Sequence, residues 1–84
     1  MFIHIGKNTV IKSSEVIVIL DRNSLKSIAT SEFLQIAKEE GFVKNEEDGK
    51  SIVITDKNVY YSPISSVTIL KRANVLVDLN EYNG

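Results

Sequence analysis

Residues 51–72, SIVITDKNVYYSPISSVTILKR, constrain the fold of this 84-residue chain more than any other stretch. Two β-rich runs, at 52–54 and 59–61, flank the polar break at 56–58. Pro63 ends the second run, and Ser65 or Ser66 is suited to cap a short helix that reaches Arg72. The stretch therefore predicts a strand, a turn, a second strand and a short helix.

Three further elements are predicted upstream. Residues 1–5 and 9–11 are typical of strands, and the turn residues between them predict a hairpin. Residues 15–20, EVIVIL, form a near-continuous apolar run, which is typical of a strand covered on both faces, the second by a helix or by another subunit. Residues 25–40 predict the main helix, capped by Ser24 or Ser27 and ended by Gly41, with an apolar face of Ile28, Ala29, Phe33, Leu34, Ile36 and Ala37.

The remaining segments complete the predicted architecture. Residues 42–55 are interpreted as a hairpin with a loop of about five residues. Residues 73–84 are interpreted as a weak edge strand or an oligomer-contact tail, frayed from residue 81 onward. The sum is a single α+β domain over residues 1–84, with one small antiparallel sheet of about five to six short strands, one main helix and one short helix.

Composition excludes several classes of protein. There is no cysteine and a single histidine, which argues against disulfides and structural zinc. The sequence contains neither an apolar run of membrane-spanning length nor a signal-peptide pattern, so a cytoplasmic protein without membrane contact is expected. Ten basic and eleven acidic residues give a net charge of −1, so no global basic field attracts nucleic acid.

No residue pattern indicates catalysis. His4 is interpreted as a strand residue rather than a general base, because no Ser–His–Asp or Cys–His order accompanies it. The acids at 46–48 lack calcium-loop spacing, and Gly6-Lys7 and Gly49-Lys50 lack the spacing of a phosphate loop. We expect no enzyme activity, cofactor, metal or small-molecule substrate.

Tyr60 and Tyr61 leave two interpretations open. They are suited to stack on bases, but neighbours on a strand point to opposite faces, so a core or subunit-contact role is favoured. With Val18 of the apolar run, they are the predicted oligomer-contact residues. Lys71-Arg72 end the short helix, where cations favour the helix dipole, and a phosphate contact is the less common alternative.

Three motifs carry a family resemblance over residues 1–73. They are the opening F-I-H-I-G, the run K-S-S-E-V-I-V-I-L and the most specific segment, S-I-V-I-T-x-x-N-V-Y-Y-S-P-I-S-S-x-T-I-x-K-R-A. Together they resemble the RemA/RemB family of bacterial extracellular-matrix regulators, within it the RemB branch. The resemblance implies a cytoplasmic, non-enzymatic protein of Gram-positive bacteria. It also implies a relative of transcription activators for biofilm matrix genes, which form rings whose outer basic residues contact DNA.

The sequence departs from the RemA pattern at the DNA-contacting positions. The RemA-type arginine before the third strand falls on Glu15, and the paired arginines beside Gly49 are replaced by Lys50. Lys50 is therefore the candidate nucleic-acid-binding residue at these positions, and Lys12 and Lys7 are further candidates on the rim that no motif supports. Each lost cation–phosphate contact lowers the salt-dependent part of DNA affinity.

Two functions from different classes follow. The first is a homo-oligomeric, ring-forming regulator of matrix genes that binds double-stranded DNA, since repetition of a weak basic patch raises avidity. The alternative is an oligomeric regulator that acts through protein partners with little or no DNA affinity, which the net charge, Glu15 and the acidic loop at residues 45–49 favour.

Overall fold

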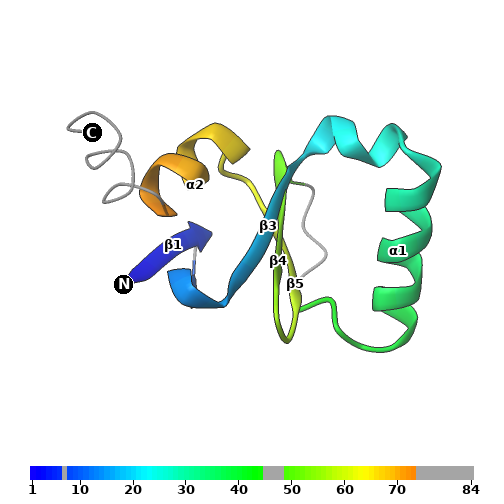
Figure 1. Cartoon of the computed structure of the whole chain (residues 1–84), viewed down its shortest axis with the longest axis horizontal. Coiled ribbons are helices and arrows are strands. Elements are labelled where there is room, and N and C mark those ends of the chain that lie inside the picture. The colour runs from blue at the N-terminus through cyan, green and yellow to red at the C-terminus, as the bar shows by residue number, and fades with distance from the viewer. Residues whose placement is uncertain (7, 45–48, 74–84) are drawn as a thin grey trace.

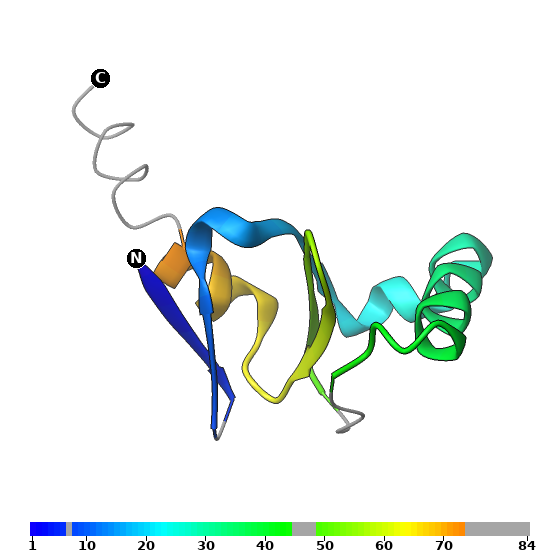
Figure 2. The same ribbon diagram turned by 90° about the horizontal axis from the view of Figure 1, so that it is seen from below.

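The computed structural model describes residues 1–6, 8–44 and 49–73 of the chain. At its centre lies a three-stranded antiparallel sheet in the order β3 (Val16–Asp21), β4 (Ser51–Thr55) and β5 (Val59–Ser62). One face packs against the hairpin of β1 (Phe2–Gly6) and β2 (Thr9–Lys12) and against helix α2 (Ser66–Ala73) (Figure 1). Helix α1 (Ile28–Glu39) lies on the other face, as the view in Figure 2 shows. Short 3-10 turns, η1 (Ser13–Glu15) and η2 (Arg22–Lys26), flank β3.

The predicted α+β class is confirmed, but the prediction of one sheet is wrong. The five described strands form separate sheets of two and three strands. Both edges of β4 are occupied, by β3 and by β5. The β1–β2 hairpin therefore joins by packing its apolar face, which buries Ile3, Ile5 and Ile11, and not by extending the ladder.

Within one subunit, the strand that is covered on both faces is β4 and not β3. Cover of the second face of residues 15–20 by a helix is therefore wrong, whereas cover by another subunit stays a prediction. Ile52 and Val53 are both buried, on opposite faces of the sheet. β3 lies at the sheet edge, and its Ile17 is 67% exposed at a bulge between Val16 and Val18. The two strands have similar apolar runs, and pairing on both sides is what gives β4 the central position.

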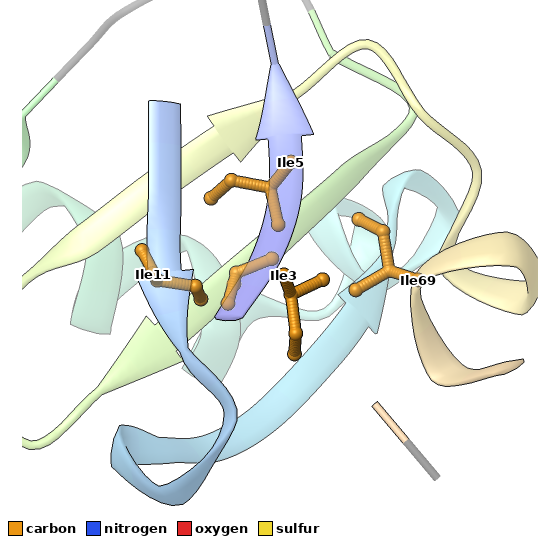
Figure 3. Close-up of a cluster of buried hydrophobic side chains, with 5 residues drawn as sticks. Ile3, Ile5, Ile11 and Ile69 are labelled. Atoms are coloured by element: carbon orange, nitrogen blue, oxygen red, sulfur yellow. The ribbon is translucent and has the colours of Figure 1, made fainter. Parts of the chain in front are cut away.

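The core cluster on the hairpin side is nearly closed to solvent. Ile3 and Ile5 from β1, Ile11 from β2 and Ile69 from α2 point toward one another (Figure 3). They pack with Val53, and none of the five is more than 4% exposed. Alternation along β1 and the helical turn of α2 thus bring one face of each element into the same cluster.

Helix α1 begins at Ile28 and not at Leu25, because residues 22–26 form η2. Of the two predicted caps, Ser27 is confirmed, since its Oγ accepts a hydrogen bond from the N–H of Thr30 at 3.4 Å. Gly41, with φ of 82°, follows the helix in the left-handed conformation that favours glycine. The predicted apolar face is only partly covered: Leu34 and Ala37 are buried, whereas Ile28, Phe33 and Ile36 are exposed.

The predicted hairpin over residues 42–55 is wrong. Val43 instead forms an isolated parallel bridge with Val59. The N–H of Lys44 donates to the Val59 carbonyl, and the N–H of Val59 donates to the Phe42 carbonyl. Since β4 has no free edge, the chain leaving α1 runs along the outer edge of β5.

The short C-terminal helix is confirmed, and Ser65 caps it by accepting a hydrogen bond from the N–H of Thr68 at 3.3 Å. The predicted weak strand or tail after Ala73 lies outside the described residues. Among the described helices, neither is long and apolar enough to cross a membrane.

Candidate nucleic-acid interface

The ends of three strands meet at a buried serine, and we call Ile5, Gly49, Lys50 and Ser62 the Ser62 junction. Ser62 is fully buried; its Oγ donates to the Ile5 carbonyl and accepts from the N–H of Ile64 at 3.1 Å. Its carbonyl accepts from the N–H of Lys50 at 2.7 Å. The junction therefore connects the β1–β2 hairpin to the entrance of β4.

Gly49 is required at this junction by the close approach of two backbones. A Cβ atom at this position would lie 2.5 Å from the Ser62 carbonyl oxygen and 2.9 Å from its nitrogen. Only glycine lacks that atom, so a side chain here forces the backbone before Lys50 to move. The position of Lys50 thus depends on its neighbour.

Lys50 and Arg22 lie side by side at this end of the sheet. The Lys50 carbonyl accepts a hydrogen bond from the N–H of Arg22 at 3.0 Å, directly beyond the ladder pair Asp21–Ser51. Both side chains are exposed. Two exposed basic residues therefore occupy neighbouring backbone positions at this end of the sheet.

Among the residues that the structure describes, Asp21 is a carboxylate that lies beside this pair. Asp21 precedes Arg22, and its Oδ2 accepts a hydrogen bond from the N–H of Asn23 at 3.3 Å. Its Oδ1 lies 3.5 Å from the hydroxyl of Ser66, at the start of α2. Asp21 thus caps η2, and its negative charge offsets part of the local positive potential.

The structure separates the three lysines predicted from the sequence. Lys50 lies at the Ser62 junction, whereas Lys12 lies at the open end of the β1–β2 hairpin, opposite Phe2. Lys7 lies outside the described residues, although its neighbour Gly6 approaches Pro63, next to Ser62. Lys12 and Lys50 are therefore not parts of one patch within a subunit.

Sequence reasoning missed Arg22. The signal was present, because Arg22 directly follows β3 and Lys50 directly precedes β4. Antiparallel pairing of these two strands brings the two residues next to each other, whereas residues 51–55 were predicted to pair with residues 42–44.

Glu15, where the resemblance places an arginine, lies at the opposite end of β3 from Arg22. Its carbonyl accepts from the N–H of Asp56 at 3.1 Å, at the β4–β5 turn. Six strand residues at about 3.3 Å each separate the two ends by about 20 Å. Within one subunit, Glu15 therefore does not belong to the Lys50–Arg22 pair.

The predicted oligomer-contact residues lie on both faces of the central sheet. Tyr60 is half-buried against the hairpin-side cluster, and Tyr61 is half-buried against the α1-side cluster. Val18 is exposed on β3, opposite Ile54 in the ladder.

The geometry around His4 is that of a strand residue. Its side chain is exposed, and its carbonyl accepts a hydrogen bond from Arg72 Nη1 at 2.8 Å. The described residues contain no group of three or more His, Asp or Glu side chains placed to hold a metal ion.

Comparison with known proteins adds two findings. The family model described as RemA-like, extracellular matrix regulatory protein A-like, matches residues 2–73. The chain is also 35% identical over 80 residues to the extracellular matrix regulatory protein B of Bacillus subtilis (strain 168). That alignment covers 95% of this chain and 99% of the relative.

Proposed function

Since the chain belongs to the RemA-like family of extracellular matrix regulatory proteins, we propose that it is a non-enzymatic regulator of matrix genes that binds double-stranded DNA as a closed homo-oligomer. The observation that supports the DNA contact is the backbone hydrogen bond from the Arg22 N–H to the Lys50 carbonyl, which places two exposed basic residues at neighbouring positions. The names of its relatives support the regulatory role.

Repetition of the pair in an oligomer supplies the affinity that one subunit lacks. The chain has a net charge of −1, and two cations neutralise few phosphates. When several subunits engage one duplex, each further contact is intramolecular and avidity rises without new contact types. The proposed DNA affinity therefore increases with the number of subunits that engage one duplex, and it falls strongly as the salt concentration rises.

The test measures binding of the full-length protein to labelled duplex DNA from the upstream region of its own matrix genes, across a series of salt concentrations. Lys50→Glu and Arg22→Glu are each expected to weaken binding, and losing one phosphate contact lowers the slope of log K against log salt by about 0.9. Lys44→Glu is the matched control, because Lys44 is an exposed lysine bonded to Val59 at the other end of β5.

Two results contradict this proposal. Absence of binding by the unmodified protein at low salt removes DNA as the partner. Equal weakening by Lys44→Glu and by the two junction variants removes the Ser62 junction as the contact site, since a general charge effect then explains the loss.

A protein partner is the second candidate, and the exposed apolar side chains around α1 favour it. Phe33, Ile36 and Phe42 are all exposed beside the sheet. Under this alternative the protein regulates matrix genes without touching DNA. Retention of the matrix phenotype by Lys50→Glu and Arg22→Glu in cells favours it, whereas loss of the phenotype with both favours DNA contact.

A further inference from the structure

The outer edge of the central sheet is formed by β3, and no described strand pairs with it there. β3 ends the strand order β3-β4-β5, and the β1–β2 hairpin forms a sheet of its own. Alternate residues of a strand direct their N–H and C=O groups toward one edge. Part of the β3 backbone therefore points away from β4, where another extended segment can pair with it.

The sequence of β3 does little to protect this edge. Natural edge strands commonly carry lysine or proline, because an open apolar edge pairs with other chains. Residues 16–20 are all apolar, and a bulge between Val16 and Val18 is the protective feature that β3 shows. Ile17 is 67% exposed and Val18 is 38% exposed. An edge of this composition is typical of one that a further segment covers.

Helix α2 leads the chain to this edge. Ser66, at the start of α2, has its Oγ 3.5 Å from Oδ1 of Asp21, the last residue of β3. At the other end of α2, Leu70 and Ala73 line a surface cavity of about 360 Å³ together with residues 16–19 of β3. α2 therefore runs in the direction opposite to β3, and the chain beyond Ala73 continues from beside the beginning of β3.

The sequence that follows Ala73 fits this edge in length and in pattern. Residues 74–84, NVLVDLNEYNG, lie outside the described residues. Val75, Val77 and Leu79 alternate, which is the pattern of a strand with one apolar face. Eleven extended residues span about 36 Å, whereas the six residues of β3 span about 20 Å. The segment is therefore long enough to follow the whole edge.

The connection from β5 also suits a strand at this place. β3 and β5 are both antiparallel to β4, so they are parallel to each other. A segment that starts beside the beginning of β3 and follows its edge runs parallel to both strands. Parallel strands need a connection of about a dozen residues or more, usually one that contains a helix. Residues 63–74 have that length and contain α2.

We propose that the outer edge of β3 is a docking site for the chain's own C-terminal segment, with residues 75–79 adding as a parallel strand in the same subunit. Val75, Val77 and Leu79 then face the cavity between α2 and β3. The backbone of the segment pairs with the open edge, and its apolar side chains supply the cover that Ile17 lacks. This inference is independent of DNA contact at Lys50.

Amide hydrogen exchange of the full-length protein, followed by NMR over a range of protein concentrations, tests the proposal. Residues 75–79 are expected to exchange roughly tenfold or more slowly than an unstructured peptide, at every concentration. Val77→Pro removes a backbone donor, and Val77→Glu places a charge in the cavity. Both variants are expected to abolish the protection of residues 75–79 and to speed exchange of the β3 amides that point away from β4.

Two matched controls accompany these variants. Leu76 is the neighbour of Val77, and successive strand residues point to opposite faces, so Leu76→Glu is expected to keep the protection. On the receiving strand, Ile17→Glu is expected to abolish it. Ile28→Glu changes an equally exposed isoleucine of α1 that does not line the cavity, and it is expected to change nothing. Far-UV circular dichroism of each variant confirms that the fold is retained.

Three results overturn the proposal. The first is exchange of residues 75–79 at the rate of an unstructured peptide in the unmodified protein. The second is protection that disappears on dilution together with a fall in mass by light scattering, because a second copy then supplies the segment. The third is an equal loss of protection in Leu76→Glu and Val77→Glu, because a strand with one face toward the cavity separates the two. All three leave DNA binding to be decided at Lys50.

Discussion

The two faces of the central sheet differ in how completely they are closed. On the hairpin side, Ile3, Ile5 and Ile69 are at most 1% exposed and are enclosed by β1, β2 and α2. On the α1 side, Leu34 and Ile52 are buried, but Phe33 and Ile36 beside them face solvent. The central cluster on the hairpin side is thus closed, while the α1 side combines buried residues with exposed apolar side chains directly beside them. In a chain of this size, apolar surface left outside the core is available to stabilise an assembly.

The largest expected effect tests whether the hairpin side is the more closed core. Ile69→Ala is expected to lower the free energy of unfolding by about 2–5 kcal/mol, because the surrounding β1 and β3 side chains cannot collapse into the space. Leu34→Ala is expected at the lower end of that range, since Leu34 borders an open surface cavity of about 230 Å³ into which neighbouring side chains can relax. Urea denaturation of both variants measures the difference. A larger loss for Leu34→Ala contradicts the comparison.

An intermediate effect is expected at the junction that joins the hairpin to the sheet. Gly49→Ala is expected to destabilise the protein by about 1–3 kcal/mol, because the added Cβ overlaps the Ser62 backbone. Gly6→Ala is the control, since a Cβ there meets no atom closer than 3.8 Å. Thermal denaturation compares the two. Equal melting temperatures show that the chain around Gly49 adjusts without cost and that the junction does not rigidly position Lys50.

The smallest effect on the isolated subunit is expected on the open side of α1. Ile36→Glu changes an exposed side chain, so at sub-micromolar concentration its free energy of unfolding is expected within about 0.5 kcal/mol of the unmodified protein. If the exposed face of α1 belongs to the contact of the proposed homo-oligomer, the melting temperature of the unmodified protein is expected to rise with concentration, and that of Ile36→Glu is not. Calorimetry over a concentration series measures both. If the melting temperature of the unmodified protein does not depend on concentration, the exposed side of α1 does not bind a second copy of the chain.

Elements that depend on short-range sequence patterns could be predicted from the sequence. Alternation at residues 1–5, the turn residues after it and the serines before each helix predicted the hairpin, the Ser27 cap and helix α2 (Ser66–Ala73). Lys50 was also identified as a candidate site residue before its surroundings were known. These predictions depend on hydrogen bonds and side-chain periodicity within a few residues.

Only the tertiary structure decided which strand is central and which cations are neighbours. The runs in β3 and β4 are nearly equivalent in sequence, and the pairing of β4 on both edges exposed Ile17 and buried Val53. The same long-range pairing placed Arg22 beside Lys50 and left Lys12 elsewhere. The physical reason is that the pairing of strands depends on packing between distant parts of the chain. Arg22 and Lys50, 28 positions apart, therefore become neighbours although no local sequence pattern predicts it.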